Sequence, residues 1–150
     1  MWITQAIAAE HVTLLRVFDE VERALPDFES AAEVGRLAGI LENVLRTHGK
    51  LETKLAFLPL DHALHHQKQL KVLHHDHREV DEHLHRVHEA ASCSEAQRQL
   101  RAAIVAARAH FRQEELRVFP VLERTLPGSA MEALGAAFER PPTAVARRAR

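Results

Sequence analysis

The sequence predicts an all-α fold, an antiparallel up-and-down four-helix bundle followed by a short C-terminal helix. Apolar residues recur at spacings of three and four along four long segments, and helix-capping and helix-ending residues bound each segment. No segment indicates a strand, and short connections favour antiparallel neighbours. A chain of 150 residues that is 46% apolar is long enough for one core. We expect the bundle to occupy residues 1–128, and a short helix with a basic tail to occupy residues 129–150.

The first two predicted helices each carry polar residues inside an apolar stripe. The first starts at Thr4, which can cap it, and stops before Pro26. The second starts with a capping box of Ser30 and Glu33 and runs toward Pro59. The first stripe is Ile7, His11, Leu14, Phe18, Val21 and Leu25, and the second is Val34, Leu37, Leu41, Val44, His48, Glu52 and Leu55. Histidine and glutamate therefore occupy positions that the periodicity assigns to the core.

The third and fourth predicted helices repeat this pattern. Residues 60–69 have no clean stripe and are interpreted as a connection or a frayed first turn. The third helix ends near Ala91, and the fourth is capped by Ser94 with Gln97 and ends at Leu126. The third stripe is Leu70, Leu73, His77, Val80, Leu84 and Val87, and the fourth is Leu100, Ala103, Ala107, His110, Glu114 and Val121.

The polar stripe residues predict a metal site. Since a helix rises about 1.5 Å per residue, they fall in one layer of the bundle. They are His11, His48, Glu52, His77, His110 and Glu114. Burying them unpaired would cost several kcal/mol per charge, and a bound cation compensates for that cost. Two helical His-x3-Glu pairs suit a dinuclear centre. Imidazole and carboxylate without thiolate favour iron, zinc or manganese, and carboxylate bridging favours iron or manganese.

The same residues resemble the hemerythrin-like family of HHE cation-binding domains, over roughly Ile7 to Leu126. The resemblance implies a four-helix bundle around two non-haem iron ions, with Zn or Mn as substitutes, histidines as terminal ligands and two bridging carboxylates. It further implies binding or sensing of O2, NO or peroxide, or iron sensing. The motifs that carry it are Glu10-His11, His48-x3-Glu52 with Phe57-x-Pro59, Asp76-His77, and His110-x3-Glu114-Glu115 with Phe119-Pro120.

The third predicted helix departs from the oxygen-carrying members of that family. Those members look to have two histidines one turn apart on this helix, whereas here Leu73 stands one turn before His77. Either His74 or Asp81 could supply a seventh ligand, and Glu115 is an alternative to Glu114. These departures argue against reversible oxygen carriage and leave a metal buffer or iron-responsive structural module as the alternative function.

Other features narrow the class of protein. A net charge of −1 predicts neither nucleic-acid nor membrane-surface binding, because only the C-terminal arginines cluster. The lone Cys93 and the absence of a signal-like or 18-residue apolar run predict a cytoplasmic protein.

Ferritin-like di-iron enzymes use two Glu-x-x-His motifs, and this chain has one, at Glu82 and His85. We therefore expect a binding or sensing protein rather than an enzyme, with reduction of peroxide or O2 as a side activity. The remaining histidines between His62 and His88 are expected on the solvated surface.

Overall fold

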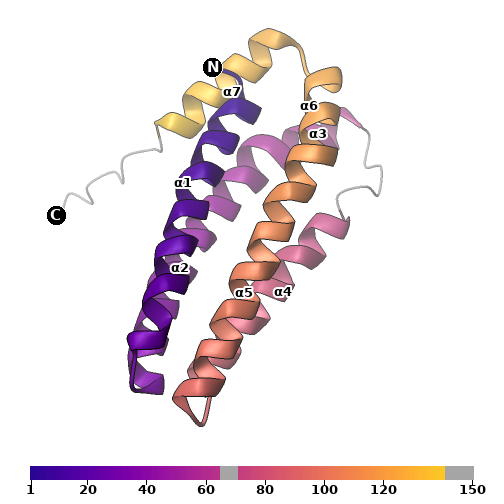
Figure 1. Cartoon of the computed structure of the whole chain (residues 1–150). Helices are drawn as coiled ribbons and strands as arrows, with labels where there is room; N and C mark the ends of the chain where they lie inside the picture. The colour runs from indigo at the N-terminus through magenta and orange to yellow at the C-terminus, as the bar shows by residue number, and fades with distance from the viewer. Residues whose placement is uncertain (65–70, 141–150) are drawn as a thin grey trace, which may run out of the picture.

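The computed structural model shows four antiparallel helical rods with a fifth helix across one end (Figure 1). It describes residues 1–64 and 71–140, with the side chains of residues 71–76 left out, and no strand occurs within these ranges. The predicted fold class is confirmed. The long helices are α1 (Ile3–Ala24), α2 (Ala31–Glu52), α4 (Lys71–Glu89) and α5 (Cys93–Gln113), and α7 (Gly128–Glu139) crosses the end where α1 begins.

Two of the rods contain a wide π-helical turn at a His-x3-Glu pair, directly after Glu52 in the second rod and beginning at Glu114 in the last. In the second rod, η2 (Thr53–Phe57) connects α2 to α3 (Leu58–Ala63). In the last rod, η4 (Glu114–Val118) connects α5 to α6 (Phe119–Thr125). π-turns within α-helices are rare and are frequent at functional sites.

The π-turns explain why Pro59 does not end the second rod. A proline in an α-helix clashes with the carbonyl four residues earlier, which for Pro59 belongs to Leu55 in η2. The π-turn changes the bonding there, so that Leu58 N donates to Thr53 O, five residues back. The predicted stop at Pro59 is therefore wrong, and so is the predicted connection for residues 60–63, because the helix continues to Ala63. Residues 65–70 lie outside the described ranges.

The helix starts agree with the sequence at α2 and differ by two residues at α5. Ser30 Oγ accepts from Glu33 N at 3.3 Å, and Glu33 Oε2 accepts from Ser30 N at 3.0 Å, which confirms the capping box. At α5 the N-cap is Ser92 rather than Ser94, and Ser92 Oγ accepts from Glu95 N at 3.1 Å. Two serines flank Cys93, and the spacing to Glu95 selects the earlier one.

Thr4 does not cap the first helix. The helix already starts at Ile3, with Trp2 as its N-cap residue, so Thr4 lies inside the first turn. Its side chain is buried, and its hydroxyl donates to Glu123 Oε1 at 2.8 Å. Thr4 thus links α1 to α6 instead of terminating α1.

The buried residues form two apolar clusters on either side of a polar layer. One cluster lies toward the Ser92 end of the bundle and is built around Phe18, Leu41, Leu84 and Leu100. The other lies toward α7 and contains Ile3, Ile7, Phe57, Leu60, Phe119, Leu122, Met131 and Phe138. The buried polar layer between them holds His11, His48, Glu52, His110 and Glu114.

Several predicted stripe positions are not fully buried. Val44 is exposed, because Leu45, one residue on, packs against the core in its place. Leu37 is half-buried, and Ala38 lies inside instead. Leu55 and Val121 are also half-buried, since each π-turn adds a residue per turn and shifts the buried face. The rest of the first and fourth stripes is buried as expected.

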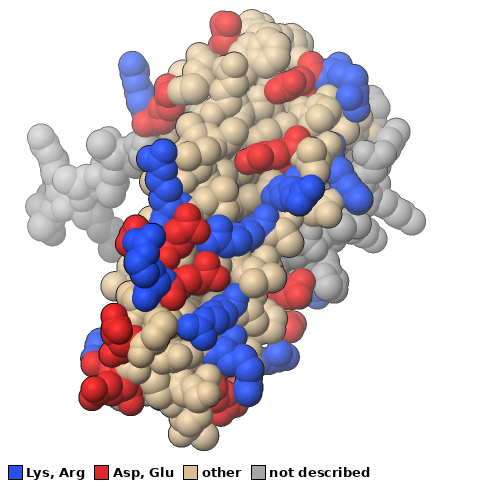
Figure 2. Space-filling model, viewed as in Figure 1, with Lys and Arg blue, Asp and Glu red and all other residues tan. Residues whose placement is uncertain are grey.

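The face formed by α1 and α5 carries interspersed positive and negative side chains, as Figure 2 shows. Arg108 on α5 joins the two helices through Asp19 at 2.7 Å and Glu22 at 2.8 Å on α1. Its guanidinium also lies 5.7 Å from the centre of the Phe18 ring. None of the described helices combines the length and the apolar composition needed to cross a bilayer.

Candidate metal centre

The structure brings all six predicted stripe residues together in the polar layer. They form two overlapping sets, and the ligand atoms of each set lie within 4.8 Å of one another. Each set has two histidines and shares the same two glutamates. The first set is His11, His48, Glu52 and Glu114, and the second is Glu52, His77, His110 and Glu114.

In the first set, one ring nitrogen of His11 faces the other ligand atoms, and the opposite ring nitrogen is hydrogen-bonded to a carboxylate outside the set. His11 Nε2 lies 3.2 Å from His48 Nε2, 3.2 Å from Glu52 Oε1 and 3.4 Å from Glu114 Oε2. On the other side of the ring, His11 Nδ1 donates to Glu115 Oε1 at 2.9 Å. A carboxylate that accepts from Nδ1 leaves Nε2 available as a metal ligand.

His48 has the same arrangement. Its Nε2 lies 2.9 Å from Glu52 Oε1, and its Nδ1 donates to Glu10 Oε2 at 2.9 Å. Sequence reasoning did not assign this supporting role to Glu10, and it weighed Glu115 only as a ligand. A signal was present, because Glu10 precedes a stripe histidine and Glu115 follows a stripe glutamate.

The second set is more open. His77 Nε2 lies 3.8 Å from Glu52 Oε2, and its side chain is 27% exposed. His110 is buried, with Nε2 3.0 Å from Glu114 Oε1, and the His77 and His110 rings meet edge to face with centroids 4.2 Å apart. Burial and the charge of His110 lower the pKa of His77 below its ordinary value. His77 is thus the only solvent-accessible member of the six.

The first set has raised histidine pKa values. Burial by itself would lower the pKa of His11, but its contacts with Glu114 and Glu52 outweigh burial and raise the pKa to about 10. For His48, Glu10 and Glu52 likewise outweigh burial and raise the pKa to about 9. Burial would raise the pKa of Glu52, yet the hydrogen bonds from His11 and His48 hold it well below its usual range. In the absence of metal, protons on these imidazoles balance the buried carboxylate.

The two shared carboxylates retain unused acceptor capacity. Glu52 Oε2 and both oxygens of Glu114 are buried and accept no hydrogen bond from any residue that the structure describes. His110 Nε2 lies 3.0 Å from Glu114 Oε1, and His11 Nε2 lies 3.4 Å from Glu114 Oε2. Leaving buried carboxylate oxygens without a partner costs free energy, and a cation would remove that cost. The donor set therefore fits one or two metal ions.

Aromatic rings close the first set from the bundle interior. The Phe111 ring stacks on His11 with centroids 4.0 Å apart and an interplanar angle of 8°. It also meets the edge of His48 at 5.2 Å, and Phe119 lies 6.1 Å from His11. The two rings thus place apolar surface against His11, and Phe111 also contacts His48.

The alternatives left open by the sequence are placed as follows. Glu114 converges with the other ligand atoms, whereas Glu115 supports His11 from outside. Asp81 is exposed and belongs to neither set. The side chain of His74 lies outside the described residues.

The histidines of α4 beyond residue 80 face other partners. His83 Nδ1 contacts Gln99 at 3.0 Å, His85 pairs with Glu89 at 3.3 Å, and His88 pairs with Glu42 at 3.4 Å. None of these three belongs to a converging group of metal-ligating side chains among the described residues. Their separate partners agree with a solvated surface.

Comparison with known families decides the family of the chain. A family model described as the hemerythrin HHE cation-binding domain matches residues 3–122. The chain belongs to this family. The comparisons with curated proteins and with solved structures gave no match. The hemerythrin match covers all six converging residues and ends in α6, so that α7 lies beyond it.

Proposed function

We propose that this hemerythrin-like protein binds two iron ions and uses them to bind or sense O2, NO or peroxide. The observation that carries the proposal is the pair of overlapping four-ligand sets that share Glu52 and Glu114. Two shared carboxylates between two pairs of histidines suit two ions rather than one. The absence of thiolate from the sets, together with carboxylates in shared positions, favours iron or manganese, with zinc as a substitute.

The number of ligands supports a reactive role. Each set offers two imidazoles and two shared carboxylates. Sets of two histidines and a carboxylate with open positions are typical of non-haem iron that reacts with oxygen. When bound, two ferrous ions would supply the electrons for interaction with O2, NO or peroxide.

The residues of this chain hold and protect such a pair. Glu115 and Glu10 fix the orientation of His11 and His48 through their Nδ1 atoms, at 2.9 Å in both cases. Phe111 covers His11 and limits the access of water. We propose binding or sensing rather than catalysis, with reduction of peroxide or O2 as a side activity.

The test is anaerobic loading with Fe²⁺, followed by elemental analysis and absorbance before and after exposure to O2, NO and peroxide. We expect two irons per chain, a near-ultraviolet charge-transfer band, and loss of both in Glu114→Ala and in His48→Ala. Protein that gains neither iron nor absorbance, and whose melting temperature is indifferent to chelators, would contradict the proposal.

A second candidate is a metal buffer or an iron-responsive structural module without gas chemistry. The open second set favours it, because His77 is partly exposed and a metal held there can exchange. Tight iron binding with a reduced spectrum that none of the three small molecules changes would support this candidate over the first.

A further inference from the structure

A pocket beside the second ligand set is not used by the proposed function. It lies between α2 and α4, has a volume of about 320 Å³, and is lined by His77 and His110 of the second set and by His48 of the first. Its floor is apolar and includes the buried residues Val80 and Phe111. The pocket therefore connects the accessible half of the metal centre to solvent.

One rim of the pocket is positively charged. Arg46, Lys50 and Lys54 follow one another at spacings of four on the same edge of α2 and η2, and all three are exposed. Arg46 pairs with Glu42 at 2.6 Å, but Lys50 and Lys54 have no ion-pair partner among the described residues. The facing rim on α4 carries one acidic residue, Asp81. The rim thus has more positive than negative charge and attracts anions.

A glycine keeps the inner part of the pocket open. Gly49 lines the pocket, and a Cβ added to it would lie 3.5 Å from Cε1 of His77 and 3.7 Å from Nε2. A longer side chain at this position would occupy the space beside His77.

The pocket is larger than a diatomic gas requires. A water molecule occupies about 30 Å³ of liquid, and pockets for small organic ligands begin at about 300 Å³. The pocket, at about 320 Å³, is therefore at the lower end of the range for small organic ligands. An apolar floor, a cationic rim and the metal centre at the inner end match a ligand with an apolar body and one negative charge.

We propose that this pocket binds a small organic carboxylate against the His77 and His110 half of the centre. Lys50 and Lys54 attract the carboxylate, and the floor formed by residues such as Val80 and Phe111 contacts its apolar body. The proposal rests on the proposed function in that bound metal adds positive charge at the inner end of the pocket. The lysines and the pocket itself do not depend on metal.

The probes are benzoate, its neutral isostere benzamide, and acetate, which lacks the apolar body. Each is titrated into Co²⁺-loaded and metal-free protein by calorimetry, with the visible Co²⁺ spectrum as a second readout. We expect benzoate to bind more tightly than either comparison ligand, to bind more tightly with metal than without, and to change the Co²⁺ spectrum. Equal affinities for benzoate and benzamide would overturn the proposal.

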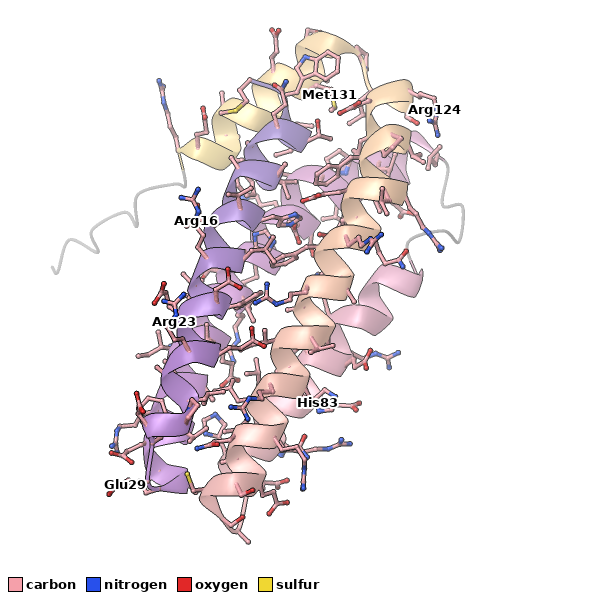
Figure 3. The ribbon with its side chains drawn as sticks, in the orientation of Figure 1. Arg16, Arg23, Glu29, His83, Arg124 and Met131 are labelled. Carbon is pink, nitrogen blue, oxygen red and sulfur yellow. The ribbon has the colours of Figure 1, made fainter. Side chains whose placement is uncertain are left out.

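Variants locate the binding site. Lys50→Gln with Lys54→Gln is expected to weaken benzoate binding roughly threefold to tenfold and to reduce its dependence on salt. Gly49→Leu fills the pocket and is expected to abolish binding. The matched control is Arg16→Gln, because Arg16 projects outward from α1 (Figure 3) and does not line the pocket. If Gly49→Leu also loses metal, the double lysine variant is the deciding test of the pocket. Equal benzoate affinities in that variant and in Arg16→Gln would overturn the proposal.

Metal content is measured separately for every sample, which distinguishes the two proposals. Protein that binds metal but not benzoate overturns only the carboxylate pocket. If the protein binds no metal, the proposed function fails, and the titration of the metal-free protein still decides whether the pocket binds benzoate.

Discussion

The two halves of the candidate centre have the same types of ligand but different surroundings. The half with His11 and His48 is fully buried, and both imidazoles have a carboxylate behind them. The half with His77 and His110 contributes both of its imidazoles to the lining of the pocket, to which the other half contributes His48, and His77 is partly exposed. Glu52 and Glu114 belong to both halves. The comparison shows that a site can be symmetric in ligand chemistry and asymmetric in access and proton affinity.

This asymmetry assigns different tasks to the two halves. Imidazoles that are oriented from behind and shielded from water favour tight, permanent binding of a metal ion. An ion beside a pocket is accessible to ligands and can exchange with solvent. We therefore expect the His11 half to hold its metal and the His77 half to carry the reactivity.

The largest expected effect on metal affinity comes from the outer carboxylates, Glu10 and Glu115, which accept hydrogen bonds from the Nδ1 atoms of His48 and His11. Glu10→Gln and Glu115→Gln remove the negative charge behind His48 and His11. We expect each change to weaken metal binding at the first set roughly 10- to 100-fold, with a smaller effect at the second set. Competition with a chelator of known affinity measures the metal affinity at both positions.

The control for these variants is Glu20→Gln, since Glu20 is an exposed α1 carboxylate paired with Arg23. Equal weakening of both metal positions by Glu10→Gln would show that the two halves are not distinct in the proposed way.

Proton release gives a second way to separate the halves. With pKa values of about 10 and 9, His11 and His48 are protonated in metal-free protein at pH 7, whereas the lowered pKa of His77 leaves it neutral. A metal must displace a proton from each protonated imidazole. We expect metal uptake at pH 7 to release protons in wild type and in His77→Ala, and to release fewer in His11→Ala. Calorimetry in buffers of different ionisation enthalpy measures this number.

The same pKa values predict opposite effects of rising pH on the stability of the metal-free fold, which falls, and on metal binding, which strengthens. For His11 and His48 the folded-state pKa lies above the unfolded value of about 6.5, so protonation stabilises the metal-free fold. That contribution is complete below pH 6.5 and is lost as pH rises through 9 to 10. Metal binding instead strengthens over this range. The gain in melting temperature on metal binding should therefore grow from pH 6 to pH 9, and a gain that shrinks would contradict the assignment.

The sequence predicted the long helices but not the π-turns within two of the rods. A period of 3.6 residues is a property of the whole rod, so the stripe of the first helix was correct in every residue. The π-turns at η2 and η4 were not predicted, because one extra residue per turn leaves little trace in hydrophobic spacing. Pro59 was interpreted as a helix end for the same reason.

The six candidate ligands could be predicted because they break an apolar stripe, which is a local signal. The positions of Glu10 and Glu115 next to stripe residues were a signal, but their hydrogen-bond partners and the pocket could not be predicted, since both depend on how helices pack. Glu10 contacts a histidine 38 residues away, and the pocket takes its walls from α2, α4 and α5. Spacing along one helix contains no information about which side of the neighbouring helix faces it.

The smallest expected effect uses two glycines of α2. Replacing a glycine in a helix interior by alanine stabilises by about 0.5–1 kcal/mol, provided the new methyl group fits. At Gly39 nothing lies within 4 Å of the added Cβ, whereas at Gly49 it meets His77 Cε1 at 3.5 Å. Both variants should raise the free energy of unfolding of metal-free protein. Only Gly49→Ala should also slow the loss of metal to a chelator, because its methyl group restricts the movement of His77. If Gly39→Ala slows that loss equally, the effect comes from general helix stability and not from the open half of the centre.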